Sequence, residues 1–340
     1  MLKILNNSKD NSVKDENGIT TKFGEKTIIF LPGCKWYNYY QRPQGMFTAL
    51  SKSLPDWDFI FCDLGAEQPI KNETNNLFIV SNDWFEQTKS ELYHCVFCTT
   101  VPWKYDEILN ARGRWFDFVD DPKIFYQDED KEKYKVLRDT KNILNIANIT
   151  TCSSQRLISD FSKYSANKIT LLKNAANPEN THLPSFTEKT SVVIGFWGFR
   201  GPWVNTELLI FLAERFPVLL AGAVIPESKT KTVGILPYNK LKDFAKKCTH
   251  LIIPFRDNRV TYYANPLKYY EYLYSNRVLI LPERLENRTP ERTEIIYTDN
   301  NWDKLENDIN NIKFWDNKDI PFELHSWETR AKKFIETYIK

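Results

Sequence analysis

Short apolar runs alternate with stretches of helical spacing along most of this chain, and this alternation limits the folds open to it. In the first half, strand-like runs lie at 27–33, 58–62, 77–80, 95–99, 114–119, 149–153 and 169–173, and helical spacing at 44–53, 84–92, 132–147 and 154–164. Strands that alternate with helices are typical of a parallel sheet with helices on both faces. We therefore predict a doubly wound α/β domain.

The same alternation begins again after a polar stretch. The second set of predicted strands lies at 192–197, 218–221, 233–236, 250–254 and 278–281, with helices at 206–216, 241–247, 266–275, 302–312 and 326–339. The sequence thus predicts two Rossmann-like domains that face a central cleft. We expect a loose leader at 1–22, one domain at 23–185, a second at 186–322, and a C-terminal helix within 323–340 that packs back across both.

Charge and hydropathy narrow the classes of function. The 46 Lys and Arg residues are matched by 44 Asp and Glu, which argues against a nucleic-acid binder. The longest apolar run, 217–226, is about half the length of a membrane span, and the N-terminus has no signal-peptide pattern, so we expect a cytoplasmic protein. Cys95 and Cys98 form a C-x-x-C within a strand-like run, which favours buried, reduced thiols over a metal site.

The most distinct local pattern is a helix start near residue 265. Asn265 is a good N-cap, Pro266 suits the first helical position, and Lys268 and Glu271 follow one turn apart. The free N–H groups and dipole of a helix N-terminus favour an anion there. An ordinary surface ion pair between Lys268 and Glu271 is the alternative, and it stays open at this point.

Other candidates lie where predicted strands end, because ligands of open α/β sheets bind at that edge. They are Trp36, Arg42, Gln44, Trp103, Asp120 and Asp121 in the first domain, and Gly198, Arg200, Tyr238 and Arg256 in the second. Each has a structural alternative. Asp120 and Asp121 are either a general base or caps of the turn into Pro122. Arg42 either binds a ligand or holds a turn, and Gly198 either admits a phosphate or is a plain turn glycine.

Several of these segments, taken in order, resemble bacterial GT-B glycosyltransferases. The resemblance rests on Trp36 with QRPQ at 41–44, FVDD at 118–121, NAAN at 174–177, IPFR at 253–256, NPLK at 265–268 and YEYL at 270–273. Two positions depart from it. Tyr263 stands where retaining members commonly have an acidic residue, and Gly45 where relatives often have His. These departures leave open whether transfer retains or inverts the anomeric configuration.

The resemblance implies a glycosyltransferase that uses a nucleotide-diphosphate sugar, with UDP weakly preferred, and no metal or other cofactor. The donor would contact Gly198, Arg200, Tyr238, Arg256, Asn265, Leu267, Lys268 and Glu271, with Glu271 on the ribose hydroxyls. The acceptor, a glycan or lipid-linked sugar of cell-surface polysaccharide biosynthesis, would contact Trp36, Arg42, Gln44 and Trp103, and Asp120 or Asp121 would be the base. Peripheral contact with the inner membrane face would suit such an acceptor.

Two other functions remain open from the sequence. One is a sugar-nucleotide epimerase on the same fold. The other is a catalytically silent GT-B subunit that binds nucleotide or glycan and supports a partner enzyme. Tyr263 and Gly45 are the features that keep the silent subunit in view.

Overall fold

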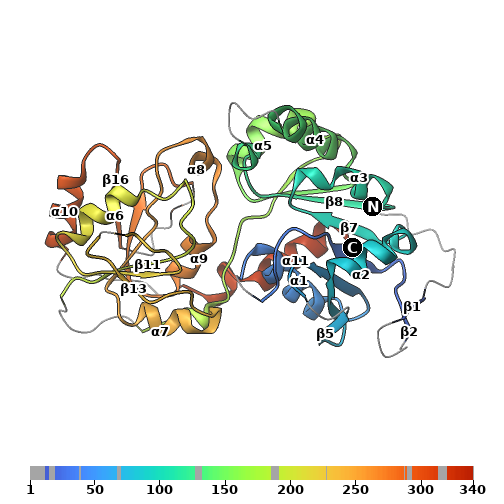
Figure 1. Ribbon diagram of the computed structural model, residues 1–340, viewed down its shortest axis with the longest axis horizontal. Coiled ribbons are helices and arrows are strands. Elements are labelled where there is room, and N and C mark those ends of the chain that lie inside the picture. The colour runs from blue at the N-terminus through green and yellow to red at the C-terminus, as the bar shows by residue number, and fades with distance from the viewer. Residues whose placement is uncertain are drawn as a thin grey trace. The chain divides into compact units, whose positions relative to one another are not determined.

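The protein folds into two compact units (Figure 1). The computed structural model describes residues 12–14, 20–37, 40–66, 70–126, 132–184, 191–226, 228–286, 288, 293–312 and 320–339. Unit 1 comprises Met1–Lys173 and Trp327–Lys340, and unit 2 comprises Asn174–Ser326. Of the expected leader, only β1 (Ser12–Lys14) and β2 (Thr20–Lys22) are described, and they pair as antiparallel strands.

The boundary between the units lies at 173–174 rather than at the predicted 185. The segment after Asn174 belongs to unit 2 because its backbone is bonded there. Leu183 donates its N–H to the Tyr274 carbonyl, and the Asn276 side chain donates to the Leu183 carbonyl. The boundary thus falls at the start of the polar stretch, and the described part of that stretch, 174–184, belongs to unit 2.

Unit 1 is built on a sheet whose strands stand in the order β10-β9-β8-β7-β3-β4-β6-β5. The strands are β3 (Thr27–Phe30), β4 (Asp58–Asp63), β5 (Ile70–Thr74), β6 (Leu77–Ser81), β7 (Val96–Thr99), β8 (Gly113–Phe118), β9 (Ile149–Cys152) and β10 (Thr170–Leu171). All neighbours are parallel except β5, an edge strand that pairs antiparallel with β6. The strand order reverses at β3, because the chain passes from β3 to β4 on one side and later places β7 on the other side.

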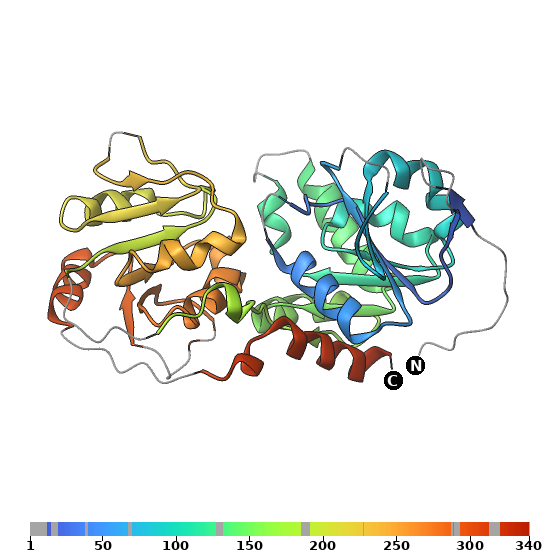
Figure 2. The same ribbon diagram turned by 90° about the horizontal axis from the view of Figure 1, so that it is seen from below.

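Helices cover both faces of this sheet (Figure 2). They are α1 (Arg42–Ser53), α2 (Asn82–Thr88), α3 (Tyr105–Asn110), α4 (Glu132–Ile146), α5 (Gln155–Phe161) and α11 (Trp327–Tyr338). The C-terminal helix α11 lies against α1. A Cβ atom on Gly45 would come within 2.3 Å of the Trp327 indole, so the missing side chain at residue 45 makes room for Trp327. The expected C-terminal helix therefore packs as part of unit 1.

Unit 2 has strands in the order β13-β12-β11-β14-β15-β16, which in chain order reads 3-2-1-4-5-6. They are β11 (Ile194–Trp197), β12 (Val218–Ala221), β13 (Lys231–Thr232), β14 (His250–Ile252), β15 (Val278–Pro282) and β16 (Glu294–Tyr297). The helices are α6 (Thr206–Ala213), α7 (Leu241–Ala245), α8 (Arg259–Tyr263), α9 (Leu267–Leu273) and α10 (Trp302–Asn311). This order is that of dinucleotide-binding folds, and its switch point lies between β11 and β14.

The described part of the chain also contains seven short 3-10 turns. They are η1 (Lys89–Leu92), η2 (Pro102–Lys104), η3 (Pro122–Phe125), η4 (Ser162–Tyr164), η5 (Pro178–Asn180), η6 (Tyr238–Lys240) and η7 (Phe322–Leu324). None of the described helices is both long and apolar enough to cross a bilayer.

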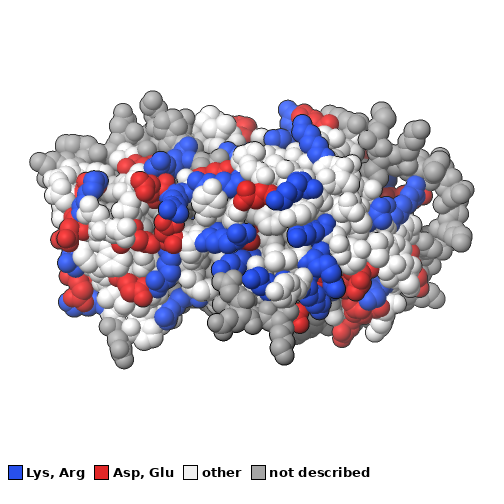
Figure 3. All heavy atoms as spheres, turned by 90° about the horizontal axis from the view of Figure 1, so that it is seen from above, with Lys and Arg blue, Asp and Glu red and all other residues white. Residues whose placement is uncertain are grey.

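Basic side chains gather on unit 1 over α4 and α5 (Figure 3). The exposed and half-exposed ones are Lys133, Lys135, Arg138, Lys141, Arg156, Lys163 and Lys168. The exposed acids of the same stretch are Glu132 and Asp160. This face is therefore more positive than the whole chain, whose formal charge is only +2.

Candidate functional site

Gly198 and Lys268 meet at the switch point of unit 2. Gly198 follows β11 with φ +149°, and its N–H donates to the Ala221 carbonyl at 2.9 Å. A Cβ atom at residue 198 would lie 2.1 Å from Lys268 Cε and 2.7 Å from Nζ. Glycine is thus needed both for the backbone angle and for the Lys268 side chain that covers it.

The Lys268 ammonium lies beside Gly198, at the carboxyl end of β11. The side chain is half-buried, and in the described structure it forms no hydrogen bond or ion pair. Burial lowers the pKa of Lys268, and the charge of Glu271 opposes that shift. A desolvated cation with three free N–H groups is suited to an anionic ligand such as a phosphate.

Glu271 lies one turn further along α9 and is buried, with only 3% of its surface exposed. Its Oε2 accepts a hydrogen bond from Trp197 Nε1 at 2.9 Å. Burial raises the pKa of Glu271, whereas this hydrogen bond, the Lys268 charge and a contact with the Tyr238 hydroxyl lower it. The alternative of a surface ion pair is wrong, since Glu271 lies in the core and bonds to an indole.

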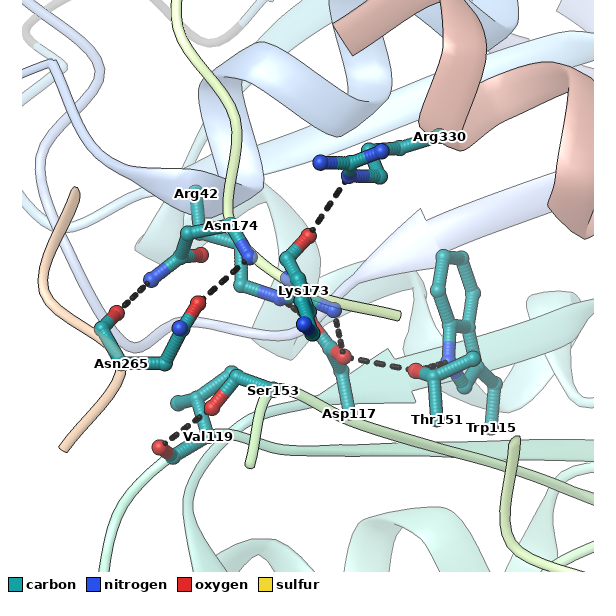
Figure 4. A network of polar contacts seen from close by, with 10 residues as sticks. All are labelled: Arg42, Trp115, Asp117, Val119, Thr151, Ser153, Lys173, Asn174, Asn265 and Arg330. Atoms are coloured by element: carbon teal, nitrogen blue, oxygen red, sulfur yellow. Dashed lines mark hydrogen bonds and ion pairs between the residues drawn. The ribbon is translucent and has the colours of Figure 1, made fainter. Parts of the chain in front are cut away.

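The start of α9 differs from the prediction. The helix begins at Leu267 with Pro266 as its N-cap, so Asn265 lies one residue outside the expected capping position. Asn265 instead joins two segments of unit 2, since its Oδ1 accepts from Asn174 N–H at 2.8 Å and its Nδ2 donates to the Tyr270 hydroxyl at 3.0 Å (Figure 4). Because α9 has only 7 residues, a phosphate would depend on the Lys268 charge more than on a helix dipole.

The remaining predicted donor-binding residues all belong to unit 2. Arg200 is exposed and donates to the Val224 carbonyl at 3.3 Å. Arg256 is held by an ion pair with Glu207, so it is less available than Lys268. Leu267 is half-buried at the start of α9, and the Tyr238 hydroxyl accepts from Asn177 N–H at 3.4 Å.

In unit 1, β8 ends just before Asp120 and Asp121, and the two carboxylates have different surroundings. Asp121 is the N-cap of η3, and its Oδ1 accepts from the Lys123 N–H at 3.1 Å. Asp120 accepts no hydrogen bond in the described structure. Burial raises the pKa of Asp120 to about 6; Arg42 opposes this shift, and Asp121 and Asp117 add to it. The turn-cap alternative therefore describes Asp121, and Asp120 has the properties of a general base.

Arg42 and Gln44 are occupied by the protein itself. The Arg42 guanidinium donates to both oxygens of Asp117 at 2.7 and 2.8 Å, and both side chains are buried (Figure 4). Gln44 Nε2 donates to the Lys35 carbonyl at 2.8 Å, and its Oε1 accepts from Gln41 N–H. An acceptor role for either residue would need these bonds to break, so we assign both to holding the loop before α1.

Two aromatic candidates of unit 1 remain near the ends of β3 and β7. Trp36 is half-buried against Phe61, with ring centroids 4.8 Å apart. Trp103 is 46% exposed and makes an edge contact with Phe125. Tyr37 is exposed and bonds to Glu73, while Tyr39, part of the same aromatic stretch, lies outside the described residues.

Cys95 and Cys98, the C-x-x-C pair, are both buried. Burial raises the pKa of Cys95 to about 12 and that of Cys98 well above its usual value. Both thiols are free and buried, as the sequence led us to expect, and neutral thiols of this kind are poor nucleophiles.

Sequence reasoning missed two residues of these networks, Asp117 and Trp197. Asp117 accepts hydrogen bonds from Arg42 and from Thr151 Oγ1, which lies 2.6 Å away (Figure 4). A charged residue inside the apolar run RWFDF was the available signal. The sequence around Trp197 gave no such signal, since aromatic residues are common at the ends of strands.

Solved structures share this fold, although no family model and no curated protein matches the sequence. Sucrose-phosphate synthase from Thermosynechococcus elongatus is similar at 12% identity and a TM-score of 0.67, over 92% of this chain and 98% of that one. The UDP-forming α,α-trehalose-phosphate synthase from Burkholderia xenovorans is similar at 8% and 0.58, over 92% and 100%. The lipopolysaccharide outer core galactosyltransferase WaaB is similar at 11% and 0.52, over 84% and 90%.

The chain therefore has the GT-B fold of these glycosyltransferases, with two Rossmann-like domains, as the sequence predicted. Identities this low establish the fold alone. The chemistry has to be argued from the residues of the site.

Proposed function

We propose that this protein is a glycosyltransferase that moves a sugar from a nucleotide-diphosphate donor to a glycan or lipid-linked acceptor of cell-surface polysaccharide biosynthesis. UDP is the weakly preferred nucleotide. One observation carries the proposal. The unbonded Lys268 ammonium lies over Gly198 at the switch point of a 3-2-1-4-5-6 sheet, one helical turn from a buried carboxylate. That is where such sheets bind a nucleotide.

Lys268 would bind the donor diphosphate. When the bond between the anomeric carbon and the diphosphate oxygen breaks, the electron pair stays on that oxygen, and a nearby cation stabilises the negative charge. Arg200 is exposed near the end of the same strand and supplies a second positive charge. Glu271 would accept hydrogen bonds from the ribose hydroxyls. This arrangement supplies charge from side chains alone, which is why we propose transfer without a metal or cofactor.

Asp120 would take the proton of the acceptor hydroxyl. As the acceptor oxygen forms its bond to the anomeric carbon, the hydroxyl proton passes to the Asp120 carboxylate, so charge and atoms balance. Asp120 suits this step because its carboxylate is not committed to a hydrogen bond and its pKa is raised to about 6. Trp103, an exposed aromatic residue of unit 1, would stack on an acceptor sugar.

The choice of UDP and of the acceptor class draws on the structural relatives. One is UDP-forming, and another acts on the lipopolysaccharide outer core. The basic face over α4 and α5 supports peripheral contact with an anionic membrane surface (Figure 3). We expect co-sedimentation with vesicles containing anionic lipid and none with zwitterionic vesicles. Equal binding to both would contradict the membrane contact and leave the transferase proposal intact.

The first test is nucleotide binding measured by calorimetry with UDP, GDP and ADP. Lys268→Met keeps the length of the side chain and removes its charge, and we expect it to weaken binding by about 1 to 3 kcal/mol. Lys246→Met is the matched control, because Lys246 is exposed on the same unit and pairs with Asp243. If Lys268→Met binds as tightly as the wild type, Lys268 is not part of the donor site.

Incubation with sugar nucleotides then separates the three functions. A glycosyltransferase releases nucleoside diphosphate slowly even without acceptor, whereas an epimerase produces an isomeric sugar nucleotide. A silent subunit binds and does neither. Product analysis by chromatography distinguishes these outcomes.

A further inference from the structure

Trp197, the last residue of β11, holds its indole in a fixed position. The ring makes edge contacts with Tyr272 and Phe244, with centroids 4.4 and 5.9 Å away, and only 4% of the residue is exposed. The Tyr272 hydroxyl is itself fixed, since it donates to the Ile252 carbonyl on β14. The direction of the indole N–H is therefore set by packing across two strands and two helices.

That N–H points at Glu271. Trp197 Nε1 donates to Glu271 Oε2 at 2.9 Å. This hydrogen bond links the end of β11 to the carboxylate on α9. A carboxylate has about four lone-pair directions, so the bonds from Trp197 and Tyr238 restrict the orientation of Glu271 and leave other directions open for ligand hydroxyls.

Burying a carboxylate favours its neutral form, which cannot accept two hydroxyl hydrogen bonds as strongly. Burial does raise the pKa of Glu271, and the indole hydrogen bond is the largest influence that lowers it. The other titratable groups that face Glu271 are Lys268 and Tyr272 on α9 and Tyr238 on η6. Of these, only Lys268 can carry a positive charge, and Tyr238 contributes through its hydroxyl.

We propose that Trp197 is a positioning residue for donor recognition: its indole N–H orients the Glu271 carboxylate to accept hydrogen bonds from the ribose hydroxyls of a nucleoside diphosphate. The inference rests on the proposed function, because it assumes that Glu271 binds ribose. It adds that the preference for ribose over 2′-deoxyribose depends on a residue that does not touch the nucleotide.

Binding of UDP, GDP and ADP and of their 2′-deoxy counterparts tests this in the full-length protein. We expect the wild type to prefer the ribonucleotide by tenfold or more, which follows from the loss of one charge-assisted hydrogen bond. Trp197→Phe keeps an aromatic ring between Tyr272 and Phe244 but removes both the N–H donor and one ring of the indole, a loss of volume that Trp302→Phe shares. It should lose most of the preference while its affinity for the 2′-deoxy form changes little.

The pH dependence of binding gives a second readout. Ribonucleotide affinity should fall as Glu271 becomes protonated, and in Trp197→Phe this fall should occur at higher pH than in the wild type. Glu271→Gln should lack this step and keep only the pH dependence that the terminal phosphate of the nucleotide gives to every variant. A merely structural role of Trp197 would not move the pH at which affinity is lost.

Trp302→Phe is the matched control, because Trp302 is a half-buried residue of the same unit whose indole N–H has no partner in the described structure. It should leave both the preference and the pH dependence unchanged. If Trp197→Phe retains the wild-type preference, or loses affinity for both sugar forms equally, the inference is overturned and Trp197 is a packing residue. If the wild type binds none of the nucleotides, the proposed function fails and the inference fails with it.

Discussion

Asp120 and Asp121 are neighbours in sequence, yet their carboxylates have different hydrogen-bond partners. Asp121 is 1% exposed and caps η3, where its Oδ1 accepts from the Lys123 N–H at 3.1 Å. Asp120 lacks such a bond, and its pKa is raised from 3.8 to about 6, chiefly by burial. A group with a raised pKa in the folded state favours folding below pH 4, and this contribution is lost as pH rises through about 6.

Asp120→Asn should therefore stabilise the protein at pH 7 to 8 while it abolishes transfer. The gain is about 1 to 3 kcal/mol, because the cost of ionising a half-buried carboxylate disappears, and it should vanish below about pH 4. Transfer by the wild type should decline as pH falls through about 6, the pKa of Asp120. Chemical denaturation at several pH values and a transfer assay measure the two effects.

Asp121→Ala gives the contrasting result. Removing the cap of η3 should destabilise the protein by about 0.5 to 2 kcal/mol. Donor binding should stay unchanged in both variants, since both residues belong to unit 1. An Asp120→Asn protein that transfers sugar normally would mean that Asp120 is not the base.

A second prediction at this scale concerns Asn76. Its Nδ2 lies 2.9 to 3.2 Å from the carbonyls of Ser51, Leu54 and Trp57, so it joins the end of α1 to the start of β4. Asn76→Ala should destabilise unit 1 by about 1 to 3 kcal/mol, because it leaves carbonyl groups without a donor. Asn75→Ala, at the exposed neighbouring position, should change stability by less than about 0.5 kcal/mol in the same denaturation experiment.

The sequence indicated those site residues whose partners are local. Lys268 and Glu271 are one turn apart on α9 because helical spacing puts them there. The pair of Arg42 and Asp117 could not be predicted, since 75 residues separate its members; the apolar run around Asp117 indicates a buried charge but not its partner. For the same reason, Asn265 could be recognised as a polar residue next to Pro266 but not as the partner of Asn174.

At the scale of elements, α11 depends on a glycine in α1. Gly45→Ala would place a methyl group within 2.3 Å of the Trp327 indole, and we expect it to destabilise unit 1 by about 1 to 3 kcal/mol. Trp327→Leu should restore part of that loss in the double variant, because the smaller side chain frees the space. Gly24→Ala is the control, since no atom lies within 4 Å of a Cβ there. Additive effects of Gly45→Ala and Trp327→Leu would contradict the coupling.

Helices and strands with strong apolar periodicity could be predicted from the sequence, whereas short or polar strands and helices could not. The central strands β3, β4, β11 and β15 are continuous buried runs, which is typical of parallel sheets. The predicted strand at 233–236 is wrong, because β13 is the exposed pair Lys231–Thr232 at the sheet edge. The edge strands β5 and β16 and the short helix α8 went unpredicted, since their formation depends on neighbours that the local sequence does not specify.

At the scale of the molecule, unit 1 is discontinuous in sequence and unit 2 is continuous. The returning helix α11 completes the core of unit 1, with Phe334 4.3 Å from the Trp115 ring and the Tyr338 hydroxyl bonded to Thr170 at 2.7 Å. A chain that ends at Ser326 should therefore lose hydrogen-exchange protection throughout unit 1 while unit 2 keeps its own. Phe334→Ala in the full-length chain should give the same pattern more weakly. Equal loss of protection in both units would contradict this division.

The return of α11 also fixes an order of events during synthesis. A ribosome makes residues 174–326 between the sheet of unit 1 and the helix that covers it. At about 5 to 20 residues per second, Trp115 waits roughly ten to forty-five seconds for Phe334. During that interval the nascent chain carries an uncovered apolar surface, which is the kind of surface that chaperones bind. The unit that comes second in the sequence is thus the first that can finish folding.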